Sequence, residues 1–423
     1  MIKEQLTGNK LLSKANIAFF IALCTLFGLF SARAVNSLGM FAFGVVALWG
    51  VHPKKWFKDT WWILGVLWVG YYAVSYFWSA NNGNWHERIE TKLPFLILPL
   101  AFTFLPALSK KQLRLYTVFA AILLWAGIIY TAIIYFHDPI YYQKQYSYSN
   151  ILPVLMGNDH ICFSITVTLY IIWSISFWQQ LGSKILKWFI GISIAALVIY
   201  LHFLSAKTGL FALYLFFLAW GIYIAMKKNK TLGIGILAGG ALFVFIAFTY
   251  IPTFKLRTMY VFNTYREYKS GNVSVDFSDM GRMVSYDIAT KLIKEHPLAG
   301  VGAGDILDEM KKGYDRWYPQ VRDEQRLFPH NQFLTVGLGC GIPAMLLFAV
   351  WAFFPLFKFS HGKNGFFFFC SWLALMVPLM VEPFLEIQYG VFVYLFFLLW
   401  QRQLVINKEE ETNNDEFHSH ISA

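Results

Sequence analysis

The sequence carries little charge for its length. Asp, Glu, Lys and Arg make up 14% of its 423 residues, whereas hydrophobic residues make up 57% and aromatic residues 19%. A water-soluble domain carries about 25% charged residues, because its surface must be hydrated. The composition therefore excludes a soluble globular domain and predicts an all-α integral membrane protein.

Cysteine is also scarce, and no CxxC pair occurs. The sequence therefore predicts neither a disulfide framework nor a cysteine metal site. The charged segment 252–329 contains no cluster of histidine, cysteine and carboxylate with metal-ligand spacing. We expect a protein that works without a metal or another cofactor. The four cysteines all lie in apolar runs: Cys24, Cys162, Cys340 and Cys370.

Long apolar runs are abundant and predict about 12 transmembrane helices. A spanning helix needs roughly 20 apolar residues. The fourth, eleventh and twelfth runs are shorter than that, so the count could change by one or two. The runs lie near residues 16–31, 34–51, 61–80, 93–107, 116–136, 160–178, 188–206, 208–226, 232–251, 331–357, 366–381 and 384–400.

The basic residues predict the orientation. With the N-terminus inside, 18 of the 35 Lys and Arg residues fall in inner connections, 5 in short outer connections and 12 in segment 252–329. Because basic residues accumulate on the cytoplasmic side, we expect both termini to be cytoplasmic. The net charge of +11 then reflects membrane anchoring beside anionic lipids, and no nucleic-acid partner is expected.

This map divides the chain into four parts. Spans 1 to 9 occupy residues 1–251, and a large outer loop occupies 252–329. Spans 10 to 12 occupy 330–405, and a disordered cytoplasmic tail follows at 406–423, where the chain becomes polar and acidic.

The outer loop contains two predicted helices joined by a glycine-rich loop, residues 296–304. The first helix begins at Ser278 or Asp279 and ends before His296, and Asp305 can cap the second. A glycine-rich loop before a helix can bind phosphate, but a tight turn is the favoured interpretation. Arg282 lies in the first turn, where the helix dipole disfavours a cation, so we expect it to have an anionic partner.

Several of these motifs together resemble the O-antigen ligase and O-antigen polymerase superfamily. The resemblance covers about half of the chain, from 204 to 390. It rests on Arg282 in its helix, His296-Pro297-Leu298-Ala299-Gly300-Val301-Gly302-Ala303-Gly304, His330-Asn331-Gln332-Phe333-Leu334, Gly341-Ile342-Pro343, Leu204-Ser205-Ala206-Lys207-Thr208-Gly209 and Leu385-Glu386-Ile387-Gln388-Tyr389-Gly390.

The resemblance implies a metal-independent glycosyltransferase with a fold similar to the multi-span C-type glycosyltransferases. Its donor is expected to be a polyprenyl-diphosphate-linked glycan. Its acceptor is expected to be a hydroxyl, such as one on the lipid A core, at the outer face of a bacterial inner membrane, where membrane lipids surround the protein. Segment 252–329 would then be the periplasmic catalytic loop.

The same resemblance suggests roles for individual residues. His330 is expected to be the general base, since imidazole titrates near neutrality, and Arg282 is the second catalytic residue. Predicted substrate-binding residues are Arg88, Lys207, Asn331 and Glu386. Lys207 stands where the family usually has Arg, and an ammonium cannot make the paired donor bonds of a guanidinium.

Each residue has a structural alternative. His330 could cap the tenth span, and Arg88 could pair with Glu87 or Glu90 at the surface. Glu386 could orient His330 or pair with a lysine. The neighbouring Asp159 and His160 are expected to form a structural pair.

Three functions remain open: a ligase, a repeat-unit polymerase or protein O-oligosaccharyltransferase, and a lipid or polysaccharide transporter. Transporters commonly show internal repeats and broken mid-span helices. Neither is evident in the sequence, which disfavours the third.

Overall fold

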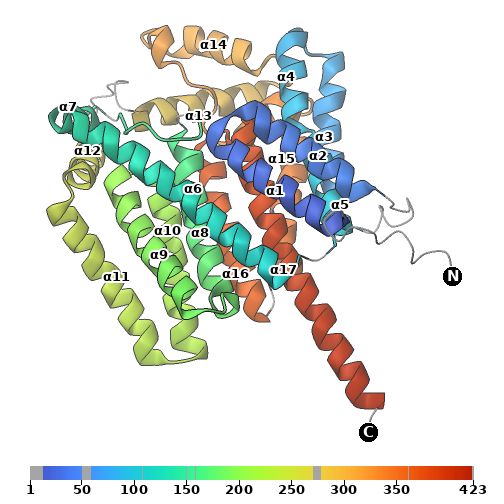
Figure 1. The fold of residues 1–423 in the computed structure, drawn as a ribbon. Coiled ribbons are helices and arrows are strands. Elements are labelled where there is room, and N and C mark those ends of the chain that lie inside the picture. The colour runs from blue at the N-terminus through green and yellow to red at the C-terminus, as the bar shows by residue number, and fades with distance from the viewer. Residues whose placement is uncertain are drawn as a thin grey trace.

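The computed structural model describes residues 13–49, 59–106, 108–148, 150–157, 159–269, 278–360 and 362–421. Within these ranges the chain forms helices and turns and no strand (Figure 1). The helices are α1 (Lys14–Ser31), α2 (Arg33–Leu48), α3 (Thr60–Val74), α4 (Asn82–Lys92), α5 (Pro94–Phe104), α6 (Lys110–His137), α7 (Pro139–Tyr146), α8 (His160–Phe177), α9 (Lys184–Leu204), α10 (Lys207–Lys227), α11 (Lys230–Tyr250), α12 (Pro252–Lys269), α13 (Ser278–Glu295), α14 (Ile306–Trp317), α15 (Gln332–Phe359), α16 (Gly362–Val381) and α17 (Gln388–Ile421).

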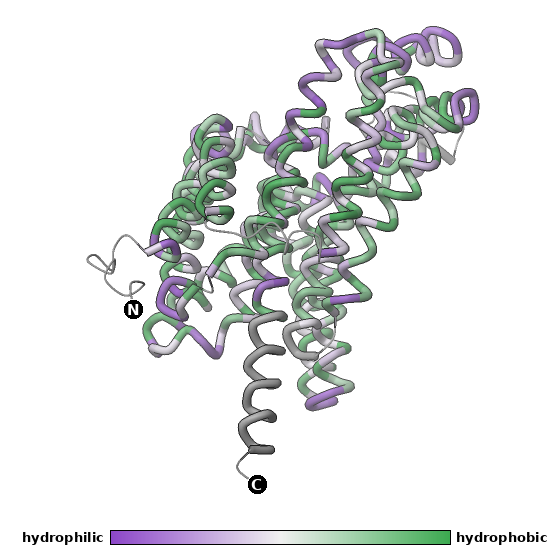
Figure 2. The backbone as a smooth tube through the Cα atoms, turned by 90° about the vertical axis from the view of Figure 1, so that its right-hand side faces the viewer, coloured by the Kyte–Doolittle hydropathy of each residue, from purple (hydrophilic) through white to green (hydrophobic). Residues whose placement is uncertain are grey.

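This architecture confirms an all-α polytopic membrane protein. Every one of the 12 predicted apolar runs overlaps a helix. Among the described residues, 7 helices are both long and apolar enough to cross a membrane, and α2 is a shorter apolar helix. The count of twelve spans stays a prediction. In Figure 2 polar residues gather toward the two ends of the bundle and apolar residues lie between them.

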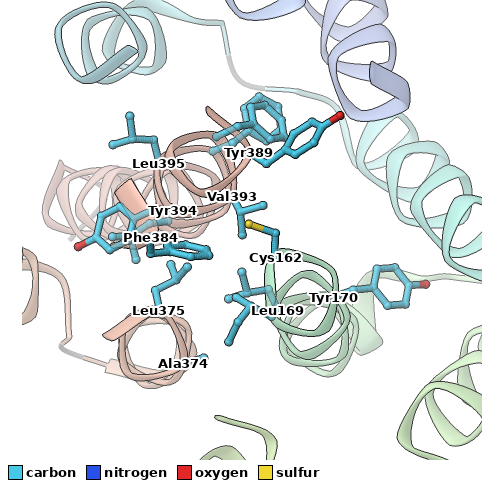
Figure 3. Close-up of a cluster of buried hydrophobic side chains, with 14 of the residues drawn as sticks. Cys162, Leu169, Tyr170, Ala374, Leu375, Phe384, Tyr389, Val393, Tyr394 and Leu395 are labelled. Carbon is cyan, nitrogen blue, oxygen red and sulfur yellow. The ribbon is translucent and has the colours of Figure 1, made fainter. Parts of the chain in front are cut away.

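The centre of the bundle consists of α8, α16 and α17. In the apolar stretch that includes α8, 78% of the residues are buried inside the protein, compared with 11% in α11. Figure 3 shows Leu169 of α8 beside Leu375 of α16 and Val393 of α17. Because α11 leaves most of its apolar surface uncovered, it lies at the lipid-facing edge of the bundle (Figure 1).

Polar side chains begin several helices by satisfying backbone N–H groups that have no partner within the helix. Asp59 accepts hydrogen bonds from the first N–H groups of α3, and Asp159 does the same for α8. Asp159 therefore has the structural role expected for it. These bonds matter near a membrane, where an unpaired N–H group is costly.

The glycine-rich loop docks into a break in α15 that is not evident in the sequence. At Gly341 the backbone is not helical, with φ 85° and ψ 172°. The break frees carbonyl groups one turn earlier. The N–H groups of Val301 and Gly302 donate to the carbonyls of Leu338 and Gly339, at 2.8 and 3.0 Å. Residues 278–329, which we call the outer segment after their predicted orientation, are thus hydrogen-bonded directly to α15.

Close backbone contact explains the glycines on both sides of this junction. A Cβ atom at Gly300 would lie 2.5 Å from the carbonyl oxygen of Leu338, and one at Gly341 would lie 2.3 Å from that of Leu298. Both glycines also have positive φ, which other residues rarely adopt. No side chain larger than hydrogen fits at these two positions without moving the backbone.

Two further N–H groups of the loop are also used. Ala303 and Gly304 donate to the hydroxyls of Ser75 and Ser79. The loop is therefore the tight structural turn favoured from the sequence, and its N–H groups are not directed at a phosphate. The sequence predicted that the side chain of Asp305 caps α14, but this side chain makes no hydrogen bond to the start of the helix. Its carboxylate instead accepts bonds from the N–H groups of Ala80 and Asn81, both at 2.7 Å, which places the α3–α4 turn against the outer segment.

The C-terminal segment differs from its prediction. The sequence predicts a disordered tail from residue 406, whereas α17 continues to Ile421. Its Lys and Glu residues at 408–411 are good helix formers and can extend a helix already begun in the membrane. The last two residues lie outside the described range.

The predicted orientation can be tested with single cysteines in a variant in which Cys24, the one native cysteine that is not buried, is replaced. We expect a membrane-impermeant maleimide to label Lys312→Cys in intact spheroplasts. Lys228→Cys should react only after permeabilisation, because the connections rich in Lys should be cytoplasmic. Labelling of position 228 in intact spheroplasts would contradict the topology.

Candidate active site at the outer end of the bundle

Three ionisable side chains meet beside the N-terminus of α15. Nδ1 of His330 lies 2.7 Å from Oε2 of Glu382, and Nη2 of Arg282 lies 2.5 Å from Oε1 of the same carboxylate. We call these three residues the His–Glu–Arg cluster. Their side chains are largely buried, with exposed fractions between 12% and 24%. The sequence interpretation brought His330 and Arg282 together, and the structure agrees.

Glu382 is the anionic partner expected for Arg282, although the sequence interpretation did not identify it. Glu382 directly follows α16 and lies in the turn that leads to α17. Burial alone raises the pKa of Glu382, but the contact with His330 and the charge of Arg282 outweigh burial, so the pKa lies below its usual value. The carboxylate is therefore held ionised beside Arg282 and His330.

Backbone interactions fix His330 in the cluster. Asn331 caps α15 by accepting hydrogen bonds from Phe333 N and Leu334 N, and its amide donates to the carbonyl of Met380 at 3.0 Å. The hydroxyl of Tyr286 donates to the carbonyl of His330 at 2.8 Å. Asn331, and not His330, thus makes the side-chain cap of this span. A direct contact between Asn331 and substrate stays a prediction.

A second carboxylate, Glu386, occupies a closed buried network. Arg88 and Lys92 of α4 each lie 2.9 Å from its oxygens. The hydroxyl of Tyr72 and the amide of Gln332 donate to it at 3.2 and 2.8 Å. Lys92 is fully buried and also donates to the carbonyl of Leu385. The network ties α3, α4 and α15 to the α16–α17 turn.

This network corrects two expectations. Arg88 pairs with Glu386 and not with Glu87 or Glu90. Glu386 does not orient His330, because its oxygens are engaged by α4; the carboxylate beside His330 is Glu382, four residues earlier. The alternative that Glu386 pairs with a lysine is confirmed by Lys92. Substrate contacts by Arg88 and Glu386 stay predictions.

Lys207 lies at the start of α10, next to another cation that the sequence interpretation did not single out. The side-chain ends of Lys207 and of Arg257 on α12 lie 5.4 and 5.3 Å from the ring centre of Tyr260. His160 lies close enough to Arg257, Arg282 and Glu382 to be influenced by the charge of each. Arg257 and the His–Glu–Arg cluster therefore belong to one charged region.

Glu382, Lys92 and Arg257 are charged residues of this region that sequence reasoning did not single out, and Glu382 and Lys92 carry a recognisable signal. Each is a charge at the edge of an apolar run, and such charges near a membrane are usually paired or functional. Glu382 was passed over because the family resemblance at 385–390 favoured Glu386. Elsewhere, no group of three or more His, Cys, Asp or Glu side chains that could hold a metal ion occurs within the described ranges.

The fold and the cluster define a polytopic helical membrane protein with a histidine-centred ionic site at one end. The family model described as O-antigen ligase matches residues 190–349. This match covers 160 of the 423 residues and supports the O-antigen ligase superfamily and, in general terms, glycan transfer of the O-antigen ligase type. The matched region runs from α9 into α15 and contains Lys207, Arg282 and His330 but neither Glu382 nor Glu386. No curated protein matches the chain.

The Glu386 network predicts a distinct response to acid. Burial alone would raise the pKa of Glu386, but Lys92 and Arg88 lower it from 4.5 to about 2. Because the pKa is lower in the folded protein, the carboxylate stabilises the fold above about pH 4.5, and this contribution is lost as the pH falls toward 2. We expect the thermal unfolding midpoint in detergent to fall across this range.

Glu386→Gln should lower the free energy of unfolding at pH 7 by about 3–5 kcal/mol, because Lys92 is left buried without its counter-ion. The variant should also lose less stability on acidification than the wild type. Glu309→Gln is the matched control, since Glu309 pairs with the exposed Lys312. Equal midpoints for the two variants would show that the network contributes little.

Proposed function

We propose that the protein transfers a glycan from a polyprenyl diphosphate to an acceptor hydroxyl, such as one on the lipid A core, at the outer face of the inner membrane. The His–Glu–Arg cluster carries this proposal, because it combines a base, a group that orients the base and a cation for a phosphate anion. The superfamily match supports it, since the matched residues include His330 and Arg282.

The cluster suits His330 to act as a general base. Glu382 lies 2.7 Å from Nδ1. In the mechanism, the imidazole ring turns so that its Nδ1–H group donates to this carboxylate, and Nε2 keeps its lone pair. Nε2 takes the proton of the acceptor hydroxyl as that oxygen forms a bond to the anomeric carbon. Glu382 then stabilises the imidazolium that results, as a carboxylate does in other histidine-centred sites.

Arg282 has the charge and the donor groups to stabilise the leaving diphosphate. As the bond between the anomeric carbon and the diphosphate oxygen breaks, the diphosphate leaves with the bonding electrons. A guanidinium can hold a phosphate with two parallel donor bonds. Arg88 and Lys207 are further candidate cations for the donor. The proton taken up by His330 returns to solvent, so atoms and charges balance.

Kinetics can separate the base from the cation. His330→Ala should reduce kcat by on the order of 10²-fold or more, while the KM for the donor changes little, because general-base catalysis contributes about that much. Arg282→Ala should mainly raise the donor KM, and Arg282→Lys should recover only part of the loss. The measurement is glycan transfer by purified protein with saturating acceptor.

Matched controls come from the same outer segment. His296→Ala and Arg316→Ala remove an exposed histidine and an exposed arginine that pairs with Glu295. Both controls should keep wild-type kinetics. Wild-type transfer by His330→Ala would remove the base assignment.

Transfer should not require a metal ion. The diphosphate leaves as a delocalised anion, and placed cations can stabilise it without a divalent ion. We expect purified protein to keep its rate after dialysis against EDTA. A rate that disappears in EDTA and returns only when Mg²⁺, Mn²⁺ or Ca²⁺ is added would contradict this mechanism.

A further inference from the structure

The glycine-rich loop carries a short apolar tip. Pro297, Leu298 and Ala299 are all exposed, and Leu298 is 77% exposed. A run of exposed apolar residues is unfavourable in water, so it marks a contact either with another protein or with a membrane. We call these three residues the apolar tip.

The apolar tip lies beside α15 at a defined level. The N–H group of Ile342 donates to the carbonyl of Pro297 at 2.8 Å, and a Cβ atom at Gly341 would lie 2.3 Å from the carbonyl oxygen of Leu298. The tip is therefore at the level of Gly341 and Ile342. Gly341 follows Gln332, the first residue of α15, by nine residues, which correspond to about 14 Å.

The length of α15 places this level inside a bilayer. α15 contains 28 residues and is a candidate membrane span. The hydrocarbon core of a bilayer is about 30 Å thick, which corresponds to about 20 helical residues. Lys358 in the last turn marks the inner boundary, because lysine is enriched just beyond the cytoplasmic ends of membrane spans.

Counting back from this boundary gives the depth of the tip. A stretch of about 20 residues that ends at Phe357 begins near Leu338, so Gly341 lies about 5 Å inside the hydrocarbon. A tilted helix needs more residues to cross the same thickness. Any tilt of α15 would therefore place Gly341 deeper.

The surface of α15 next to the apolar tip has the character of a lipid-facing surface. Ile342, Leu346 and Val350 are spaced four residues apart, which places them on one face of the helix, and they are 37%, 58% and 54% exposed. Because the backbone of Pro297 is bonded to that of Ile342, Leu298 continues this face. This continuity favours lipid, and not another protein, as the partner of the tip.

The backbone of the tip fits a position at the edge of the hydrocarbon. Non-helical backbone is tolerated there only where it packs against protein and its polar groups have partners. The N–H group of Gly300 donates to the carbonyl of His296 at 3.1 Å, and the carbonyl of Pro297 accepts from Ile342. Pro297 itself has no N–H group that needs a partner.

We propose that the apolar tip inserts into the bilayer, with the Leu298 side chain among the acyl chains of the outer leaflet, about 5 Å inside the hydrocarbon. The tip anchors the outer segment to the membrane between α13 and α14. Because α15 begins about 14 Å from the level of Gly341, the His–Glu–Arg cluster then lies about 9 Å outside the hydrocarbon, close to the lipid head groups. This inference concerns only the position of the outer segment and does not depend on the proposed reaction.

A nitroxide spin label can measure the depth of the tip. The purified full-length protein, with the unburied Cys24 replaced, is labelled at a single cysteine and placed in nanodiscs of phosphatidylcholine and phosphatidylglycerol. Leu298→Cys tests the tip, and Leu346→Cys on the same face of α15 is the hydrocarbon reference. Lys312→Cys is the water reference, because the Lys312 side chain is 72% exposed. Power-saturation electron paramagnetic resonance compares collisions with O₂, which concentrates in hydrocarbon, and with a water-soluble nickel chelate.

We expect the ratio of O₂ collisions to nickel collisions at position 298 to lie well above that at position 312. It should be lower than at position 346, which is five residues, about 8 Å, further along α15 than Gly341. The exposed Ala299 provides a second tip position. Ala299→Cys should give the same order, and it keeps the test valid if a label at position 298 prevents folding.

A ratio at the tip equal to that at position 312 would place the tip in water and overturn the proposal. Protection of the tip from both reagents would show that protein covers it and would overturn the proposal as well.

Discussion

The break in α15 at Gly341 is the constraint on which the arrangement of the outer segment depends. A helix that breaks within a membrane protein leaves carbonyl groups without donors, and each such group costs several kcal/mol in an apolar surrounding. The glycine-rich loop supplies two of these donors. Since this loop follows α13 directly and α15 begins just after His330, the same docking brings Arg282 close to His330.

The α16–α17 turn contains two carboxylates, four residues apart, that have different surroundings. Glu386 is enclosed by two cations, a hydroxyl and an amide, so its charge is fully used by the protein. Glu382 is shared between His330 and Arg282, both of which remain partly exposed. One carboxylate therefore holds the helices together, while the other contacts two side chains that remain partly exposed.

Much of the fold follows from elementary features of the sequence. Apolar runs predicted the helices, and the periodicity and turn residues of the outer segment predicted α13 and α14 with nearly correct ends. The break at Gly341 could not be predicted, because a glycine within an apolar run does not show whether another segment will satisfy the freed carbonyls. The continuation of α17 was missed because acidic, polar composition was read as disorder.

The candidate site was predictable only in part. Local motifs identified His330 and Arg282, but the pairing of charges depends on contacts between residues far apart in sequence. Arg88 had nearby glutamates at positions 87 and 90, yet it pairs with Glu386 across 298 positions. Sequence distance therefore misled the choice of partner for Arg88, and the choice between Glu382 and Glu386 for His330 required the geometry of the turn.

The burial of Lys92 has a consequence for biosynthesis. The carbonyl that it bonds lies 293 positions later in the chain, and its counter-ion follows that carbonyl directly. While the ribosome is still making the intervening helices, this ammonium has no partner and must stay hydrated, since an unpaired charge is expensive to bury. α4 can therefore settle into its final place only after the beginning of α17 has been inserted, so the assembly of the outer end is among the last steps in the maturation of the protein.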